Sequence, residues 1–410
     1  MGSRLALGRP SSPEIALIVG HKFDRLRQPW FRNVHRGVRS LIDWIEAHRN
    51  GGAPGESPAA VERAPATAAD ILSVEQQLGM ALPEDLKVVL QRYNGAHLPS
   101  GDLLPAGVAP GTIGGALRDL ATRLHRDHLD SETLLPFFRA TDGSMLAFDR
   151  GGGPVPDTWP IVDYVQETGD THLMYRTFDS WCRVSVETWR LPPELSMDTV
   201  EGYLRRGQLH VEFEPDIATG HATTAHALRR LGQPEDALRN YLRAGRCVPS
   251  LPWVDWEGFK VAALLGFPDA ALEAARRLSA RGPAELWAQR ETTPRAVADV
   301  IGRVASAQAS RDPWIRCLLA LEDQCDGSER SHIMEIRLAL GSGASAPTAS
   351  PLSGPCPVGL SGDGDADWNA LSEAYLRGDL RDDHLLLEPT LDTLRRDRNL
   401  ADLLYLRRDF

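Results

Sequence analysis

The second half of this 410-residue chain contains an internal repeat, which restricts its fold more than any other feature of the sequence. The segment Leu231–Leu238 recurs as Leu265–Leu272, 34 residues further along the chain. The matching positions are Gly232 and Gly266, Pro234 and Pro268, Ala237 and Ala271, and Leu238 and Leu272. A fixed period of this length is typical of stacked helical hairpins, in which glycine permits the turn between two helices and small residues let the helices pack closely.

The residues around this repeat resemble the second helix of a tetratricopeptide repeat. Ala237 is followed by Tyr241 and Ala244, and Pro249 stops the helix. Because one helical hairpin cannot bury its apolar face alone, at least three units are expected within residues 191–340. The resemblance implies an all-α, tetratricopeptide-like helical repeat domain. Five of its residues are expected to have a structural role: Gly232, Ala237, Tyr241, Gly266 and Ala271.

The first half of the chain predicts amphipathic helices and then short strands. Helices are expected over residues 29–48, 67–79, 83–94, 117–124 and 178–189. Residues 99–115 are rich in glycine and proline and are expected to form a loop. Short aromatic and β-branched runs predict antiparallel strands at residues 134–138, 144–149, 159–165 and 171–175. Helices on both sides of a small antiparallel sheet make an α+β domain over residues 29–190.

Residues 69–95 resemble the opening of SUKH (Smi/Knr-type) domains. The shared residues of the motif are Glu75, Leu78, Gly79, Leu82, Pro83 and Asp85, followed by Asn94 and Gly95. Residues 135–137, 143–149 and 160–162, and the helix that starts at Phe178, match the rest of the family's pattern. The resemblance implies structural roles for five residues: Glu75, Gly79, Leu82, Pro83 and Phe178.

The SUKH resemblance implies binding and not catalysis. Many bacterial members look like immunity proteins that bind a cognate toxin, often a nuclease, and the fungal relatives look like regulators of cell-wall synthesis. We therefore expect no catalytic residue, no cofactor and no metal, and we expect a partner to contact turns beside the sheet. The candidate contact residues are Asn94, Gly95, Asp142, Gly143, Asp149 and Arg150. The alternative for the same residues is that they only form turns.

The charge of the chain bears on the kind of partner. A formal net charge of −11 disfavours non-specific binding to nucleic acid. Residues 61–190 carry eleven Lys/Arg and eighteen Asp/Glu, so this domain either suits a basic partner, such as a nucleic-acid-cutting toxin, or is simply a solvated surface. The basic segment Arg25–Arg49 contains Trp30 and Trp44. It could contact nucleic acid, but packing of its apolar face on the α+β domain is the preferred interpretation.

Membrane and metal sites are not expected. No run of about 18 apolar residues is present, and the five scattered cysteines are typical of reduced thiols in a cytoplasmic protein. Asp363–Asp367 begins like a calcium loop, but Trp368 and Ala374 replace the glycine and the bidentate ligand, so helix N-capping is expected instead. His125 and His128 have a spacing that can hold zinc, but without a third ligand a solvated polar face is expected.

The sequence thus predicts five parts: an N-terminal extension (residues 1–28), a SUKH-like α+β domain (29–190), tetratricopeptide-like helical repeats (191–340), a flexible linker or loop (341–367) and C-terminal capping helices (368–410). The first hypothesis for its function is an immunity or antitoxin-like protein that neutralises a bacterial toxin. The second is a non-catalytic scaffold that acts through its helical repeats. Both require the binding of another protein, and neither requires an enzyme.

Overall fold

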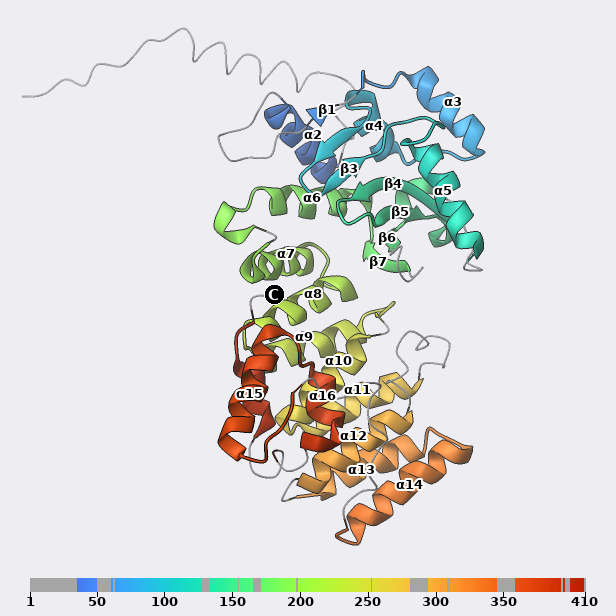
Figure 1. Cartoon of the computed structure of the whole chain (residues 1–410). Coiled ribbons are helices and arrows are strands. Elements are labelled where there is room, and N and C mark those ends of the chain that lie inside the picture. The colour runs from blue at the N-terminus through green and yellow to red at the C-terminus, as the bar shows by residue number, and fades with distance from the viewer. Residues whose placement is uncertain are drawn as a thin grey trace, which may run out of the picture.

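The computed structural model describes residues 35–49, 60–61, 63–126, 133–153, 155–164, 171–196, 198–251, 253–280, 294–307, 310–344, 358–391, 394 and 399–408. Within these residues, a sheet with flanking helices precedes a long series of helices (Figure 1). The predicted N-terminal extension and the first residues of the predicted helix 29–48 lie outside the described part of the chain.

Seven described strands form one antiparallel sheet, and each strand pairs with the next one along the chain. They are β1 (Ala60–Val61), β2 (Ala96–Leu98), β3 (Gly101–Leu103), β4 (Leu134–Ala140), β5 (Met145–Asp149), β6 (Ile161–Tyr164) and β7 (Thr171–Tyr175). The last four confirm the four predicted strands, with differences of one to two residues at the ends.

The prediction of a loop over residues 99–115 was partly wrong, because β3 lies within it and a helix begins at Ile113. A three-residue strand is too short to show the alternation of apolar and polar residues that reveals longer strands. Gly101 also suggested a loop, yet it is needed inside the sheet. A Cβ atom at Gly101 would lie 2.1 Å from the carbonyl oxygen of Arg139 on β4, and Gly101 has a φ of +144°.

Five described helices accompany the sheet: α2 (Arg36–His48), α3 (Ala68–Leu78), α4 (Glu84–Arg92), α5 (Ile113–Arg126) and α6 (Phe178–Trp189). Each of them overlaps a helix that the sequence predicts. Thr67 begins α3 with a capping box, because its hydroxyl accepts a hydrogen bond from Asp70 N while the Asp70 carboxylate accepts one from Thr67 N. Gly79, in the left-handed region at a φ of +66°, ends the helix as predicted.

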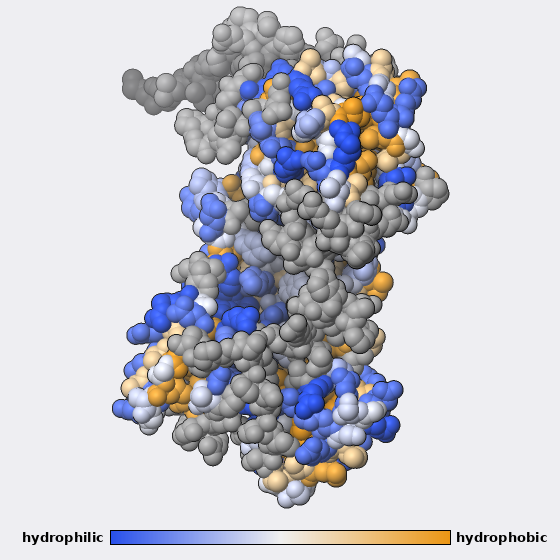
Figure 2. Space-filling view, turned by 45° about the vertical axis from the view of Figure 1, so that its right-hand side comes forward, coloured by the Kyte–Doolittle hydropathy of each residue, from blue (hydrophilic) through white to orange (hydrophobic). Residues whose placement is uncertain are grey.

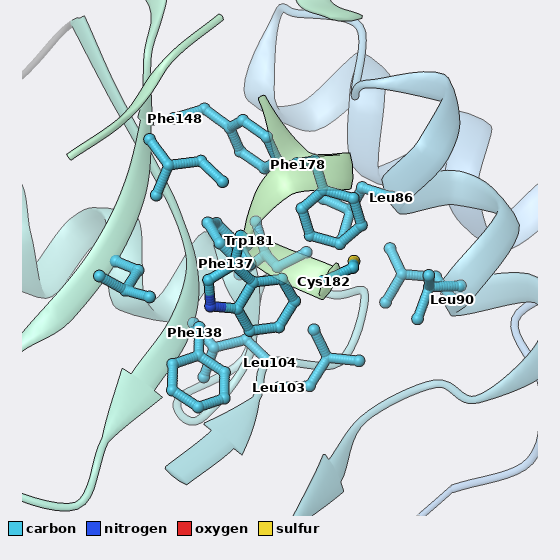
Figure 3. Close-up of a cluster of buried hydrophobic side chains, with 14 of the residues drawn as sticks. Leu86, Leu90, Leu103, Leu104, Phe137, Phe138, Phe148, Phe178, Trp181 and Cys182 are labelled. Atoms are coloured by element: carbon cyan, nitrogen blue, oxygen red, sulfur yellow. The ribbon is translucent and has the colours of Figure 1, made fainter. Parts of the chain in front are cut away.

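The core of this region lies between the sheet and α6 (Figure 3). The ring of Phe137 on β4 lies 5.3 Å from that of Phe178 and 5.1 Å from that of Trp181, both on α6. Phe148 on β5 completes the aromatic cluster at 4.7 Å from Phe137. Burial raises the pKa of the Cys182 thiol well above its usual value, so this cysteine is a protonated core residue.

Helix α2 packs along α6 and confirms the preferred interpretation of the basic segment for the residues that the structure describes. Trp44 is buried and lies 4.8 Å from Trp189, at the end of α6, while Arg36 is exposed. Trp30 lies outside the described residues. The apolar face of α2 is therefore part of the core of the α+β region.

The second half of the described chain is helical. Its helices are α7 (Val200–Phe213), α8 (Ala218–Arg230), α9 (Pro234–Arg246), α10 (Val254–Leu265), α11 (Pro268–Ala280), α12 (Pro294–Ala307), α13 (Asp312–Glu322), α14 (Gly327–Gly341), α15 (Gly364–Arg377) and α16 (Asp382–Leu387). Short 3₁₀ segments, Pro193–Leu195, Pro389–Leu391 and Leu400–Tyr405, lie between or after them. In Figure 1, the α+β region lies at the top and α7 to α14 continue downward from it.

The 34-residue repeat corresponds to two stacked helical hairpins, α8–α9 and α10–α11. Gly232 and Gly266 both have a φ of +72° in the turn between the two helices of each hairpin. Pro234 and Pro268 open the second helices at equivalent positions. Ala237 and Ala271 are fully buried, as expected for small residues that bring helices close together. The helical repeat is therefore confirmed in this part of the chain.

The C-terminal segment folds back along the helical repeats (red in Figure 1). Helix α15 begins at Gly364, inside the range predicted as a linker, and the Asp363 carboxylate caps it by accepting hydrogen bonds from Asp365 N and Ala366 N. The backbone N–H of Arg408 donates to the carbonyl of Arg230 at the end of α8 with a distance of 2.7 Å. The end of the described chain thus returns to the beginning of the repeats.

Candidate protein-binding surfaces

The residues of the SUKH motif connect α3 to α4. The Glu75 carboxylate accepts a hydrogen bond from the backbone N–H of Leu82 at 2.8 Å and pairs with Lys87 Nζ at 2.8 Å. Burial opposes the charge of Glu75, but the bonds from Lys87 and Leu82 outweigh it and lower its pKa. Leu82 is 1% exposed, and Pro83 is the N-cap residue of α4. These residues stabilise the connection between α3 and α4. The geometry of that connection accounts for their spacing in the sequence.

The first pair of candidate contact residues forms a turn. The Asn94 side-chain oxygen accepts a hydrogen bond from the backbone N–H of Ala106 at 2.7 Å. Gly95 has a φ of +93°, and a Cβ atom there would lie 3.1 Å from the ring of Pro105. The turn between α4 and β2 therefore accounts for both residues by itself, and a role in binding stays a prediction.

The other candidate contact residues lie at opposite ends of β5. Asp142 accepts a hydrogen bond from Ser144 N at 2.9 Å in the β4–β5 turn, where Gly143 has a φ of +88°. Asp149 accepts one from Gly151 N at 2.8 Å at the far end of the strand. The guanidinium of Arg150 lies 5.9 Å from the ring of Trp159. The structure therefore does not bring these residues together into a single surface.

Three carboxylates that are far apart in the sequence meet where α2, α4 and α6 begin. Asp85 pairs with His35 at 2.6 Å, Asp157 accepts a hydrogen bond from the first residue of α4, and Asp179 accepts two from the first turn of α2. Burial raises the pKa of Asp85, and the charges of Asp179 and Asp157 raise it further, against the effect of His35. This acidic surface was missed from the sequence, because it depends on how three helices converge.

A groove of about 1820 Å³ runs between the sheet and the helical repeats. Phe138, Leu146, Asp163 and His172 are direct cross-strand neighbours on β4 to β7, so they share one face of the sheet, and all four line the groove. Helices α6, α7 and α8 line it as well, and so do residues near the end of the chain. Figure 2 shows the narrower region between the two halves, where hydrophilic residues gather.

Contacts across the junction hold the two halves around this groove. The ring of His210 on α7 stacks on Tyr175 of β7 at 4.6 Å. Glu214 accepts a hydrogen bond from Arg176 N at 2.8 Å, and Thr219 on α8 donates one to Leu173 O at 2.5 Å. No sequence pattern indicated this groove, because its residues come from both halves of the chain.

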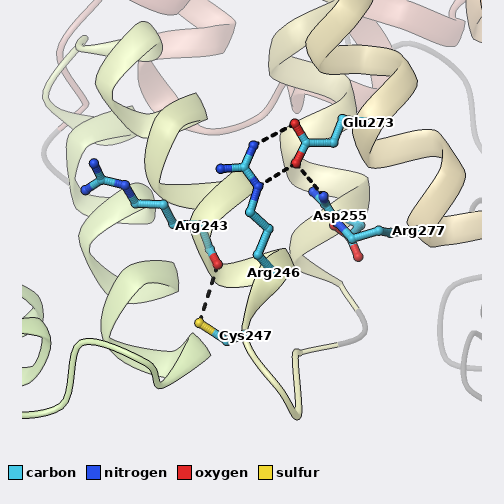
Figure 4. Close-up of polar contacts among 6 residues, drawn as sticks. All are labelled: Arg243, Arg246, Cys247, Asp255, Glu273 and Arg277. Carbon is cyan, nitrogen blue, oxygen red and sulfur yellow. Dashed lines mark hydrogen bonds and ion pairs between the residues drawn. The ribbon is translucent and has the colours of Figure 1, made fainter.

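A second polar cluster lies between the two hairpins of the repeat (Figure 4). Arg246 on α9 forms two hydrogen bonds with Glu273 on α11, at 2.7 and 2.8 Å. Arg277 bonds to Glu273 and to Asp255 on α10, each at 2.6 Å. A Cβ atom at Gly245 would lie 2.2 Å from Asp255, so this cluster requires a glycine there. Its acidic and basic groups pair with each other, which suits a role in joining successive hairpins.

The sites considered for metals do not assemble in the described part of the chain. There, no three His, Cys, Asp or Glu side chains are grouped so that they could hold a metal ion. The Asp367 carboxylate accepts hydrogen bonds from Ser361 and Gly362 and is buried, while Asp363 caps α15. His128 and the side chain of His125 lie outside the described structure. The cysteines described, Cys182, Cys247, Cys317 and Cys325, are free.

Comparison with known proteins agrees with the geometry of the first half. Residues 65–183 match the model of the SMI1 / KNR4 family (SUKH-1), a range that runs from just before α3 into α6. The chain matches no curated protein and no solved structure. None of the described helices combines the length and the apolar character needed to cross a membrane. The α+β region of this chain therefore contains a domain of the SMI1 / KNR4 family (SUKH-1), followed by a region of helical repeats.

Proposed function

We propose that this protein is an immunity protein that binds a toxin protein in the cytoplasm and neutralises it. The observation that carries the proposal is the family match over residues 65–183, because SUKH domains are generally immunity proteins of toxin systems. Neutralisation of this kind needs a complementary surface over the toxin's active face, and it needs no catalytic residue on the immunity protein.

The charge of the SUKH region supports a basic toxin, such as a nuclease, as the partner. Residues 61–190 carry eleven Lys/Arg and eighteen Asp/Glu, and Asp85, Asp157 and Asp179 lie together where three helices begin. Negative charge on one partner and positive charge on the other speed up association and favour the correct orientation. The overall net charge of −11 acts in the same direction.

The experiment that tests the proposal is co-expression with the toxin-like product of a neighbouring gene. We expect the two proteins to co-purify and the toxicity to disappear. If they neither co-purify nor suppress toxicity, the immunity function is wrong. Two separate variants, Asp142→Lys and Asp149→Lys, then locate the interface, because toxin binding should be lost only where the replaced residue contacts the toxin. Both aspartates accept one backbone hydrogen bond in a turn, so their structural cost is similar, but they lie at opposite ends of β5.

A second candidate function is a non-catalytic scaffold that binds through the helical repeats. Stacked helical repeats form extended binding surfaces, and this region lies outside the family match over residues 65–183. Phe267, a large exposed apolar residue in the turn between α10 and α11, is the position chosen to test it. Binding that survives both aspartate variants and is lost in Phe267→Glu would favour the scaffold. Point variants are better here than a truncation near residue 190, which would remove the contacts of His210 and Glu214 with β7 and the residue that follows it.

A further inference from the structure

The two walls of the groove carry opposite charge. Among the described residues that line it, the helical side has five basic residues, which we call the basic wall: Arg206, Arg229, Lys260, Arg381 and Arg408. Only two acidic residues, Glu257 and Asp382, accompany them. The opposite side, formed by the sheet and the segment after α6, has Asp142, Asp163 and Asp198 against Arg190. Because the whole chain has a net charge of −11, the basic wall opposes the overall charge.

The two acidic groups of the basic wall are already engaged. Asp382 accepts hydrogen bonds from Arg229 at 2.9 and 3.2 Å and from the Tyr375 hydroxyl at 2.8 Å. Glu257 pairs with Lys260 at 2.8 Å. Asp382 also lies close enough to Arg408 for the charge of Arg408 to lower its pKa. Arg206 forms a hydrogen bond with Tyr175, so Arg381 is the exposed cation of the wall.

Arg408 is a residue of the basic wall with a hydrogen-bond donor that has no acceptor among the described residues. Its guanidinium stacks on Tyr375, with its central carbon 4.5 Å from the ring centroid. Its Nε atom is buried, and no described residue accepts a hydrogen bond from it. A buried donor without an acceptor is unfavourable. Because Nε is covered, an acceptor in the groove would bind the terminal N–H groups of this half-buried side chain. A carboxylate is such an acceptor, and its bond to a guanidinium is assisted by charge.

The neighbouring His226 reports a positive field at the same place. Burial lowers its pKa, and the charges of Arg230, Arg408 and Arg229 lower it further. A group that resists protonation beside three arginines lies where an additional anion would be attracted.

The size of the groove indicates an extended ligand. Sites for small molecules usually have volumes of about 300–1,000 Å³, and this groove is larger at about 1820 Å³. Aromatic side chains along it, including Trp189, Tyr203 and Trp253, suit the side chains of a peptide. The C-terminal segment of this chain lies along the end of α8 in an equivalent way, and there Arg408 N donates a hydrogen bond to Arg230 O at 2.7 Å.

We propose that the groove binds an extended acidic segment of a protein partner, with the carboxylates of that segment held by Arg381 and Arg408. The site is built from both halves of the chain, so it is distinct from a surface on the SUKH domain alone. Its test uses a peptide and no toxin, and its outcome is therefore independent of the proposed immunity function.

The test is fluorescence anisotropy of the full chain with a labelled Glu-rich peptide, and with a Lys-rich peptide of the same length. We expect the Glu-rich peptide to bind in spite of the net negative charge of the protein. Arg381→Glu and Arg408→Glu should each weaken binding at least about tenfold. The matched control is Arg243→Glu, an equal change of charge at an exposed residue of α9 that does not line the groove, and it should bind as the unaltered chain does.

Several results would overturn the proposal. They are no binding of the Glu-rich peptide, preference for the Lys-rich peptide, or equal weakening by the Arg243 control. Displacement of the peptide by inorganic phosphate at the same concentration of charge would show a site for a small anion and not for a peptide. Since Arg408 also stacks on Tyr375, its variant could disturb the C-terminal segment. Arg381 is exposed, so its variant tests the proposal without this effect.

Discussion

The guanidinium of Arg229 and the carboxylate of Asp382 form a buried ion pair at 2.9 Å across 153 residues of sequence. Arg229 lies in the last turn of α8, the first helix of the repeated hairpins, and Asp382 begins α16 in the C-terminal segment. Arg229 also donates a hydrogen bond to the carbonyl of Leu404 at 2.8 Å. This one arginine therefore binds two parts of the segment that folds back on the repeats.

Replacing Arg229 should destabilise the protein strongly. Arg229→Met removes the charge that compensates Asp382 and leaves a buried carboxylate, which we expect to cost about 3–5 kcal/mol. Urea unfolding measures this loss. The double variant Arg229→Met/Asp382→Leu should recover most of the stability, because it removes both charges of the pair. A double variant no more stable than Arg229→Met would contradict the importance of the pair.

The same pair should make the docking of the C-terminal segment sensitive to acid. Burial of Asp382 favours its neutral form, but Arg229, Arg408 and Lys260 outweigh burial and lower its pKa below the ordinary 3.8. A carboxyl whose pKa is lowered by folding stabilises the protein at pH values above the pKa that it has in the unfolded chain. This stabilisation is lost as the pH falls through the pKa that it has in the folded protein. We expect the free energy of unfolding to decrease below about pH 3.8. In Asp382→Asn, this part of the decrease should be absent from urea titrations at several pH values.

Gly232 is needed for two reasons, and Gly79 for one. Both have a positive φ, +72° and +66°, which alone costs about 1–2 kcal/mol when alanine replaces glycine. A Cβ atom at Gly232 would also lie 2.3 Å from the carbonyl oxygen of Tyr405, whereas nothing lies within 4 Å at Gly79. Gly232→Ala should therefore destabilise the chain more than Gly79→Ala does. It should also speed up proteolysis of the C-terminal segment, and equal effects of the two variants would argue against the contact.

The motif residue Glu75 should matter for folding. Glu75→Ala leaves the buried backbone N–H of Leu82 without its acceptor, at a cost of about 1–3 kcal/mol. The matched control is Glu84→Ala, because Glu84 pairs with the same Lys87 but is 72% exposed. Exposed pairs contribute little, so we expect a loss below about 1 kcal/mol there. Thermal unfolding of both variants provides the comparison.

Local patterns in the sequence predicted most of the helices and the longer strands. The i, i+3, i+4 spacing of Leu86, Val89 and Leu90 predicted the buried face of α4, and all three are fully buried. The glycines of the repeat predicted the turns at 34-residue spacing. Strand β3 was missed, because three residues carry too little pattern and Gly101 resembles a loop residue until β4 lies beside it.

The sequence by itself determined most of the helices, the longer strands, the SUKH motif and the stacked hairpins, because each depends on residues close together in the chain. Only the tertiary structure decided which surfaces exist. The groove combines His172 on β7 with Arg408 at the end of the described chain, and its basic wall follows from the return of the C-terminal segment to α8. No local spacing encodes such a meeting, since it results from the packing of segments that are more than a hundred residues apart.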